Sequence, residues 1–284
     1  MKYSVFSVST PDLEPFEFID TLKELGYNGV EWRIAEIPKE IKGESPTSWG
    51  NNLCTIDPAT TNEELESLKA YTEKSGLEVV SLNPYLKVGD LEGTENVMRM
   101  AKTLGAKQIR LGQAWYDRSV NYNDLFAQAV KYLHGVEELS QTYGVKGLVE
   151  THHLTINPSA GLAHRLVDGF NPEHIGIMYD PGNLVYEGYE NFRKGLELIA
   201  PYLSHVHVKN VNWLKMEQPE DGKAWASLPE GEVDWKQALI DLRSVGYDGY
   251  LGFEDFSKSK PTRELLQFNI DYIRNLVSEV YELV

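Results

Sequence analysis

Cysteine is almost absent from this sequence of 284 residues, in which Cys54 is the single example. One cysteine cannot close a disulfide within the chain, and it cannot build the multi-thiolate shell of a structural zinc site. The sequence also lacks a run of roughly 18 or more apolar residues, which a membrane-spanning helix needs. Its first residues show neither the apolar stretch nor the cleavage site of a signal peptide. These absences predict a soluble, cytoplasmic protein with no membrane partner.

Basic residues are also scarce, because 27 lysines and arginines stand against 43 acidic residues and give a formal net charge of −16. A nucleic-acid-binding protein needs a concentrated basic surface, and no cluster of lysine and arginine of that kind occurs. The sequence therefore predicts no nucleic-acid partner. The remaining composition is that of a globular protein, and the length suits one α/β barrel.

Short β-rich runs alternate with longer amphipathic stretches along the whole chain. The predicted strands are rich in β-branched or aromatic residues and cover residues 3–8, 29–34, 77–83, 106–112, 145–151, 174–180, 203–209 and 249–255. The predicted helices cover residues 15–26, 61–76, 94–105, 123–143, 158–169, 188–200, 233–246 and 261–282.

Several of the helices end in a glycine that leads directly into the next strand, as in ELGYNGVEW (24–32). Eight strands that alternate with eight helices predict an α/β fold with a single (β/α)₈ TIM-barrel domain over residues 1–284. An open, doubly wound sheet is the alternative, but no strand precedes a glycine-rich phosphate loop of the G-x-G-x-x-G type.

Two connections, residues 35–60 and 210–232, are too long for tight loops. In a TIM barrel, long loops after the strands lie over the active site. Three tryptophans of these loops, Trp49, Trp213 and Trp225, are candidates to cover one face of a sugar or to pack their own loop.

Metal-binding side chains stand at the ends of four successive predicted strands, namely Glu150, Asp180, His207 and Glu254. Active sites of TIM barrels lie at the C-terminal ends of the strands, so these four should meet at one rim. A single acid or histidine there is more often a helix cap, a solvated group or a core residue, but chance seldom places four in succession. Three carboxylates and an imidazole favour one divalent ion, with Mn²⁺ first and Mg²⁺, Co²⁺ or Zn²⁺ as alternatives.

Five phrases resemble the xylose isomerase-like TIM-barrel superfamily, the sugar phosphate isomerase/epimerase group. They are GYNGVEWR (26–33), VETHH (149–153), MYDPGN (178–183), HVHVKN (205–210) and GYDGYLGFEDF (246–256). The resemblance implies a metal-dependent isomerase or epimerase that acts through an enediolate on a small ketose or polyol-derived ketone. It also implies that Glu150 and Glu254, besides holding the metal, move the proton. A homo-oligomer is a further implication.

Other positions are expected to contact the polyhydroxylated substrate. His152 shares a strand face with Glu150, and Lys209 shares one with His207, each with a structural hydrogen bond or ion pair as the alternative role. His153 is predicted to point the opposite way. The remaining candidates stand at or just after strand ends and are Glu31, Asn83, Arg110 and Asn183.

Alternatives remain open. The segment HVHVKNVNWLK (205–215) has no arginine where the ketose 3-epimerases carry one, and its start resembles the inosose dehydratase branch, so a dehydratase is the first alternative. An AP endonuclease-like enzyme would need ligands for three zinc ions, which strands ending in Asn83 and Arg110 do not offer. An aldolase with Lys209 as its Schiff base and a non-catalytic sugar-binding barrel complete the set.

Overall fold

Eight parallel strands form a closed ring, and the computed structural model describes residues 1–213 and 225–281 of the chain. In ring order the strands are β1 (Lys2–Phe6), β2 (Gly29–Ile34), β4 (Glu78–Pro84), β5 (Gln108–Arg110), β6 (Lys146–Glu150), β7 (Ile175–Tyr179), β8 (Leu203–Val208) and β11 (Tyr250–Phe253). Because β1 pairs with both β2 and β11, the sheet has no open edge there. This closure confirms the predicted TIM barrel and excludes the open sheet.

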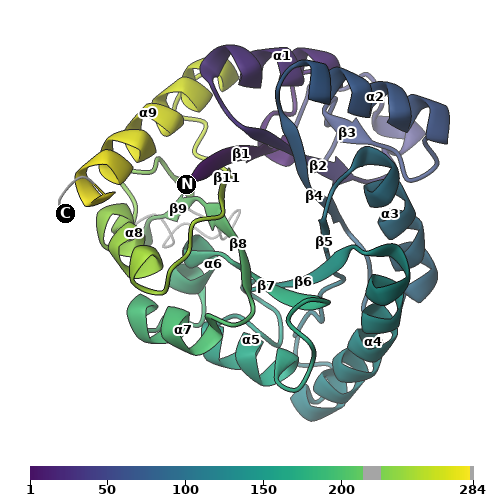
Figure 1. Ribbon diagram of the computed structural model, residues 1–284, viewed down its shortest axis with the longest axis vertical. Coiled ribbons are helices and arrows are strands. Elements are labelled where there is room, and N and C mark those ends of the chain that lie inside the picture. The colour runs from purple at the N-terminus through teal and green to yellow at the C-terminus, as the bar shows by residue number, and fades with distance from the viewer. Residues whose placement is uncertain (214–224, 282–284) are drawn as a thin grey trace.

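Helices surround the ring and return the chain from the end of one strand to the start of the next, as Figure 1 shows. They are α1 (Pro15–Leu25), α2 (Asn62–Lys74), α3 (Leu91–Leu104), α4 (Tyr122–Tyr143), α5 (Ala160–Val167), α7 (Phe192–Ile199), α8 (Trp235–Ser244) and α9 (Thr262–Tyr281). Each overlaps a predicted helix. In the described residues, no helix is both long enough and apolar enough to span a lipid bilayer.

One further helix, α6 (Pro181–Tyr186), was not expected, because the sequence DPGN reads as a turn. Asp180 instead caps this helix, since its side chain accepts a hydrogen bond from the backbone N–H of Asn183. Pro181 occupies the first turn, where a missing N–H costs nothing. The segment after β7 therefore turns straight into a short helix that starts at the rim of the barrel.

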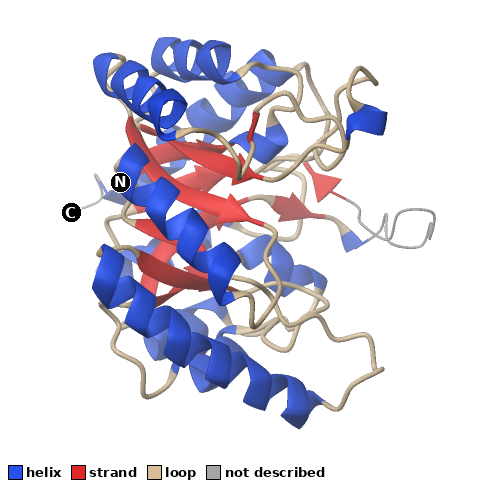
Figure 2. Ribbon diagram, turned by 90° about the vertical axis from the view of Figure 1, so that its right-hand side faces the viewer, coloured by secondary structure: helices blue, strands red, loops and turns tan. Residues whose placement is uncertain are grey.

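The arrows of the barrel strands point toward one face of the molecule, where the loops that follow the strands gather (Figure 2). The first long loop contains a 3₁₀ turn, η2 (Lys39–Ile41), and a short strand, β3 (Thr55–Ile56), which pairs with β2. The second begins with β9 (Asn210–Val211), which pairs antiparallel with β10 (Trp225–Ala226). Residues 214–224 of this predicted loop lie outside the described residues.

The apolar core lies between the outer faces of the strands and the helices. Phe18 of α1 packs edge-on against Trp32 of β2 with ring centroids 5.5 Å apart, and both side chains are fully buried. Phe16 stands on the same helix but is 46% exposed and contacts Tyr71 of α2. One helix thus carries a buried and a surface phenylalanine two positions apart.

Replacement of Phe18 by alanine should lower the free energy of unfolding by about 3–5 kcal/mol, because the cavity left against Trp32 cannot collapse completely. Phe16→Ala is the matched control and should cost less than about 1 kcal/mol. Urea denaturation followed by circular dichroism measures both. Equal losses in the two variants would contradict the assignment of the core face of α1.

Candidate metal centre

Four acidic and imidazole side chains converge at the C-terminal end of the barrel. Glu150 is the last residue of β6, Asp180 follows β7, His207 lies in β8, and Glu254 follows β11. All four are buried, with exposed fractions between 0% and 5%. One ligand atom from each lies within 4.8 Å of the others. The structure thus brings together the four residues that the strand-end pattern selected.

His207 Nδ1 is the centre of this group. It lies 3.5 Å from Glu150 Oε1, 3.8 Å from Asp180 Oδ2 and 3.6 Å from Glu254 Oε2. It is buried and has no hydrogen-bond partner among the described residues. Protein ligands approach a divalent first-row ion to about 2.0–2.2 Å. Two donors on different sides of one ion are therefore farther from each other than from the ion, and the 3.5–3.8 Å between His207 Nδ1 and the three carboxylate oxygens suits such sharing. The residues present therefore fit a single bound divalent cation.

The charge of the site leads to the same conclusion. Within the described part of the chain, and with His207 neutral as a metal ligand must be, four buried carboxylates face two buried cations, which leaves a formal charge of −2 that one divalent ion would balance. The carboxylates are Glu31, Glu150, Asp180 and Glu254, and the cations are Arg110 and Lys209. Uncompensated charge in a protein interior is strongly unfavourable. The oxygen-rich donor set favours Mn²⁺, Mg²⁺ or Zn²⁺ over copper.

Arg110 and Gln113 hold Glu150 from one side. Arg110 Nη1 lies 3.0 Å and Gln113 Nε2 2.9 Å from Glu150 Oε2. Burial alone would raise the pKa of Glu150, but the charge of Arg110, aided by His207, brings it well below its usual value. Glu150 is therefore ionised at neutral pH even without a metal.

Lys209 forms ion pairs with the other two carboxylates of the group, Asp180 and Glu254. Its Nζ lies 2.7 Å from Asp180 Oδ2 and 2.9 Å from Glu254 Oε2. Burial raises the pKa of Asp180 to about 6, and the neighbouring Glu150 and Glu254 add to this effect, while Lys209 opposes it. Burial would lower the pKa of Lys209, but the Asp180 and Glu254 carboxylates raise it. A lysine held in the ammonium form is a poor nucleophile, which argues against the Schiff-base alternative.

Above the ligands lies a cavity of about 310 Å³. It is lined by Trp49, Pro84, Tyr85, Leu86, Arg110, Leu111, Gln113, Trp115, His152, His153, Lys209, Trp225, Glu254 and Phe256. Aromatic rings form much of its wall. Three of them pack together, with the centroid of Phe256 4.6 Å from that of Trp49 and 5.2 Å from that of Trp225. Such rings commonly pack against the C–H faces of sugars and polyols.

Three residues predicted as pocket residues do not line this cavity. Asn183 lies behind the ligands, where its Nδ2 is 2.9 Å from Asp180 Oδ2 and 3.4 Å from Glu150 Oε1. Glu31 and Asn83 are fully buried beneath His207. Alternation along a strand gives the direction of a side chain but not its depth in the barrel, and Glu31 and Asn83 lie below the rim.

His153 is a second correction, because it lines the cavity together with His152 instead of pointing away from it. Strand β6 ends at Glu150, so the two-residue alternation no longer applies at positions 152 and 153. His152 Nδ1 lies 2.7 Å from the carbonyl oxygen of His153, which can only accept, so this nitrogen carries the proton. Burial lowers the pKa of His152 to about 4, so its ring is neutral at neutral pH.

Sequence reasoning missed several lining residues, among them Tyr85, Gln113, Trp115 and Phe256. Each follows the end of a barrel strand by one to a few positions, so extending the search past every strand end would have found them. Of the three loop tryptophans, Trp49 and Trp225 line the cavity, whereas Trp213 does not.

Lys209→Met should destabilise the metal-free chain by about 3–5 kcal/mol, because it removes the cation from a buried group of carboxylates. Saturating Mn²⁺ should raise the melting temperature of this variant more than that of the wild type. The ion no longer competes with the Lys209 ammonium group for the Asp180 and Glu254 carboxylates. Thermal denaturation with and without Mn²⁺ measures both effects. Lys236→Met is the control, because it breaks an exposed ion pair with Glu279, and it should change neither quantity. An unchanged Mn²⁺ effect in Lys209→Met would contradict this account.

Comparison with curated proteins finds distant relatives. The inosose dehydratase of Clostridium perfringens (strain 13 / Type A) is 27% identical over 127 residues, which cover 40% of this chain and 41% of the relative. Inosose dehydratase 1 of Bacillus cereus is 27% identical over 125 residues, which cover 43% of this chain and 38% of the relative. The matched parts thus span less than half of these proteins.

Solved structures share the fold along the whole chain. The IolI protein, crystallised with a zinc atom, superimposes with a TM-score of 0.77 at 18% identity and covers 100% of both chains. The 3-keto-D-glucoside 4-epimerase YcjR of E. coli gives a TM-score of 0.73 at 18% identity, with 97% of this chain and 99% of that chain covered. A family model described as "Xylose isomerase-like TIM barrel" matches residues 19–276. The chain therefore belongs to the xylose isomerase-like TIM-barrel family.

Proposed function

We propose that this protein is a divalent-metal-dependent enzyme that transfers a proton on a small, neutral, polyhydroxylated ketone and so isomerises or epimerises it. The observation that carries the proposal is the convergence of Glu150, Asp180, His207 and Glu254 beside an aromatic-walled cavity, which Glu254 lines. A bound divalent ion would polarise the substrate carbonyl and acidify the adjacent C–H bond. Mn²⁺ is the ion we favour.

The two glutamates are the proposed acid/base pair, and their surroundings differ. Glu254 lines the cavity, and Lys209 contacts its Oε2. Glu150 contacts Arg110 and Gln113 through Oε2 and does not line the main cavity. Glu254 is therefore the better placed of the two to remove a proton from a substrate in the cavity. For Glu150 to return the proton, substrate binding would have to draw its other oxygen, Oε1, toward the cavity.

The cations of the cavity point to an uncharged substrate. Among the described lining residues, Arg110 and Lys209 are the only lysine or arginine side chains. Both form ion pairs with site carboxylates, at 3.0 Å for Arg110 and at 2.7 and 2.9 Å for Lys209. A phosphate or carboxylate group on the substrate would have to break these pairs. We therefore propose a free sugar, a glycoside-like ketone or a cyclic polyol ketone as substrate.

Dehydration is the second candidate reaction. It is favoured by the inosose dehydratases among the curated relatives. Removal of a proton next to a ketone would begin both reactions, and loss of a β-hydroxyl would then replace proton return. His152, which lines the cavity, is placed to contact such a hydroxyl. The same first step means that one assay can detect either reaction.

The test combines metal content with isotope exchange. Wild-type protein and His207→Gln should be analysed for bound metal and incubated in D₂O with Mn²⁺ and a panel of ketoses and inososes. We expect one ion per chain in the wild type and a loss of affinity of at least about 100-fold in His207→Gln. Deuterium should enter the carbon beside the carbonyl, and the products separate isomerisation from dehydration.

His134→Gln is the matched control, because His134 is exposed on α4 and far from the strand ends. It should bind metal and exchange deuterium like the wild type. Absence of bound metal in the wild type, with no thermal stabilisation by any of the candidate ions, would contradict the proposal. Metal and sugar binding without exchange would instead favour a non-catalytic sugar-binding barrel.

A further inference from the structure

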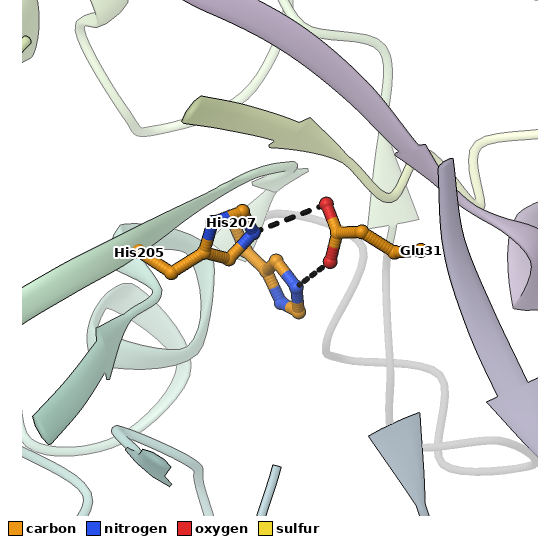
Figure 3. A group of neighbouring side chains, drawn as sticks. All are labelled: Glu31, His205 and His207. Atoms are coloured by element: carbon orange, nitrogen blue, oxygen red, sulfur yellow. Dashed lines mark hydrogen bonds and ion pairs between the residues drawn. The ribbon is translucent and has the colours of Figure 1, made fainter. Parts of the chain in front are cut away.

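A second buried group lies directly beneath the proposed metal site. Figure 3 shows the Glu31 carboxylate pointing toward the rings of His205 and His207, with one oxygen facing each ring. Glu31 Oε1 lies 3.0 Å from His205 Nε2, and Glu31 Oε2 lies 3.3 Å from His207 Nε2. All three side chains have an exposed fraction of 0%.

The Glu31 carboxylate is surrounded by donors. Besides the two imidazoles, Ser4 Oγ donates to Oε1 at 2.7 Å, and Asn83 Nδ2 lies 3.3 Å from Oε2. Each oxygen thus accepts two hydrogen bonds, which fills the roughly four lone-pair positions of a carboxylate. Burial would raise the pKa of Glu31, but the charge and hydrogen bonds of His205, with those of His207, bring it well below its usual value.

This arrangement does not suit a second metal ion, although Glu31, His205 and His207 are close enough to ligate one. A cation would need lone pairs that Ser4 and Asn83 already occupy with their protons. Each imidazole also faces its own oxygen, so the group is divided into two hydrogen bonds with no common centre. The carboxylate therefore acts as an acceptor for hydrogen bonds.

The consequence concerns the proton on His207. Because Glu31 Oε2 can only accept, His207 must present Nε2–H to it. The other nitrogen, Nδ1, faces Glu150, Asp180 and Glu254, and it is the nitrogen whose lone pair would bind the metal once any proton on it is displaced. The ring is further held by Phe6, which stacks on it with centroids 6.0 Å apart and planes inclined by 21°.

The neighbouring strand leaves room for this carboxylate by carrying glycine. A Cβ atom at Gly252 of β11 would lie 2.1 Å from Glu31 Oε1 and 2.7 Å from His205 Nε2. Contacts this short do not occur, so any other residue would displace Glu31 or His205. The glycine, the two histidines and the carboxylate therefore form one interlocking unit across β2, β8 and β11.

We infer that Glu31 is a positioning residue that fixes the tautomer and ring orientation of His207 and so prepares Nδ1 to bind the metal. His205 contributes by holding the other carboxylate oxygen. This inference rests on the proposed metal site, because its effect is exerted through His207. It assigns Glu31 a role in metal affinity and not in contact with the substrate.

The experiment measures Mn²⁺ binding to the full chain by titration calorimetry for the wild type and Glu31→Gln. Glutamine keeps the size of the side chain but offers one acceptor oxygen and an NH₂ group, so one of the two imidazoles loses its acceptor. Loss of such a partner typically weakens metal binding by about 10–100-fold, which is the expected result. Asp241→Asn is the control, because it also converts a buried carboxylate to an amide, but on α8. It should bind Mn²⁺ within about twofold of the wild type, since Asp241 lies on an outer helix and accepts a hydrogen bond from Gln237 of that same helix.

A second variant covers the case in which Glu31→Gln does not fold. Gly252→Ala keeps the charge of Glu31 and displaces its carboxylate, so it should also weaken Mn²⁺ binding at least about 10-fold. Nitrogen-15 NMR of histidine in the Zn²⁺-loaded chain supplies a readout that a general loss of stability would not move. The wild type should show a proton on Nε2 and a metal-shifted Nδ1 for His207, and Glu31→Gln should lose the hydrogen-bonded Nε2–H signal.

The outcomes separate the two proposals. A wild type that binds no divalent ion would overturn the metal site and the role of Glu31 together. A wild type that binds one ion, with Glu31→Gln and Gly252→Ala binding it equally well, would overturn the role of Glu31 alone. Two ions in the wild type and one in Glu31→Gln would show that Glu31 is itself a metal ligand, which contradicts the inference.

Discussion

The repulsion between carboxylates crowded in a space that excludes water is the constraint on which the site depends. Three of them surround His207 Nδ1 at 3.5 to 3.8 Å, where the low polarity of the interior makes like charges costly. Every neighbouring feature offsets that repulsion in part. Arg110 and Lys209 bring positive charge, and Asn183 and Gln113 bring N–H donors. The positive charge that the described residues supply does not neutralise these carboxylates when His207 is neutral, and a bound divalent cation would complete the balance.

The barrel makes this crowding possible. Glu150, Asp180, His207 and Glu254 come from the ends of four neighbouring strands, and β6, β7, β8 and β11 are consecutive in the ring. Because parallel strands all end at the same face, residues far apart in the chain arrive at one rim without any loop having to carry them there. Asp180 also caps α6, so one carboxylate fixes the start of a helix and faces the shared centre.

The sequence predicted the barrel and the four converging residues, because both depend on local patterns that repeat strand by strand. The strand ends were predicted to within a few residues, but small errors had consequences at the rim. Strand β5 ends at Arg110, and Gln113 lies past that end, outside the strand-end positions that were considered, so it was overlooked as a partner of Glu150. Strand β6 ends at Glu150, so alternation placed His153 on the wrong side. Depth was the other failure. Glu31 and Asn83 point inward as expected, yet how far below the rim they lie depends on the stagger of strands around the ring, which no single strand encodes.

The placement of the four ligands on successive strands has a consequence for how the barrel opens. A bound ion would act as a cross-link between β6, β7, β8 and β11, which span the second half of the chain. Local opening of any one of these strands would then require release of the ion, so the four would lose their independence and fluctuate as one unit. Strands β1, β2, β4 and β5 contribute none of the four ligands and would keep their own opening equilibria. A cofactor for chemistry would thus also divide the ring into a half that moves with the metal and a half that does not.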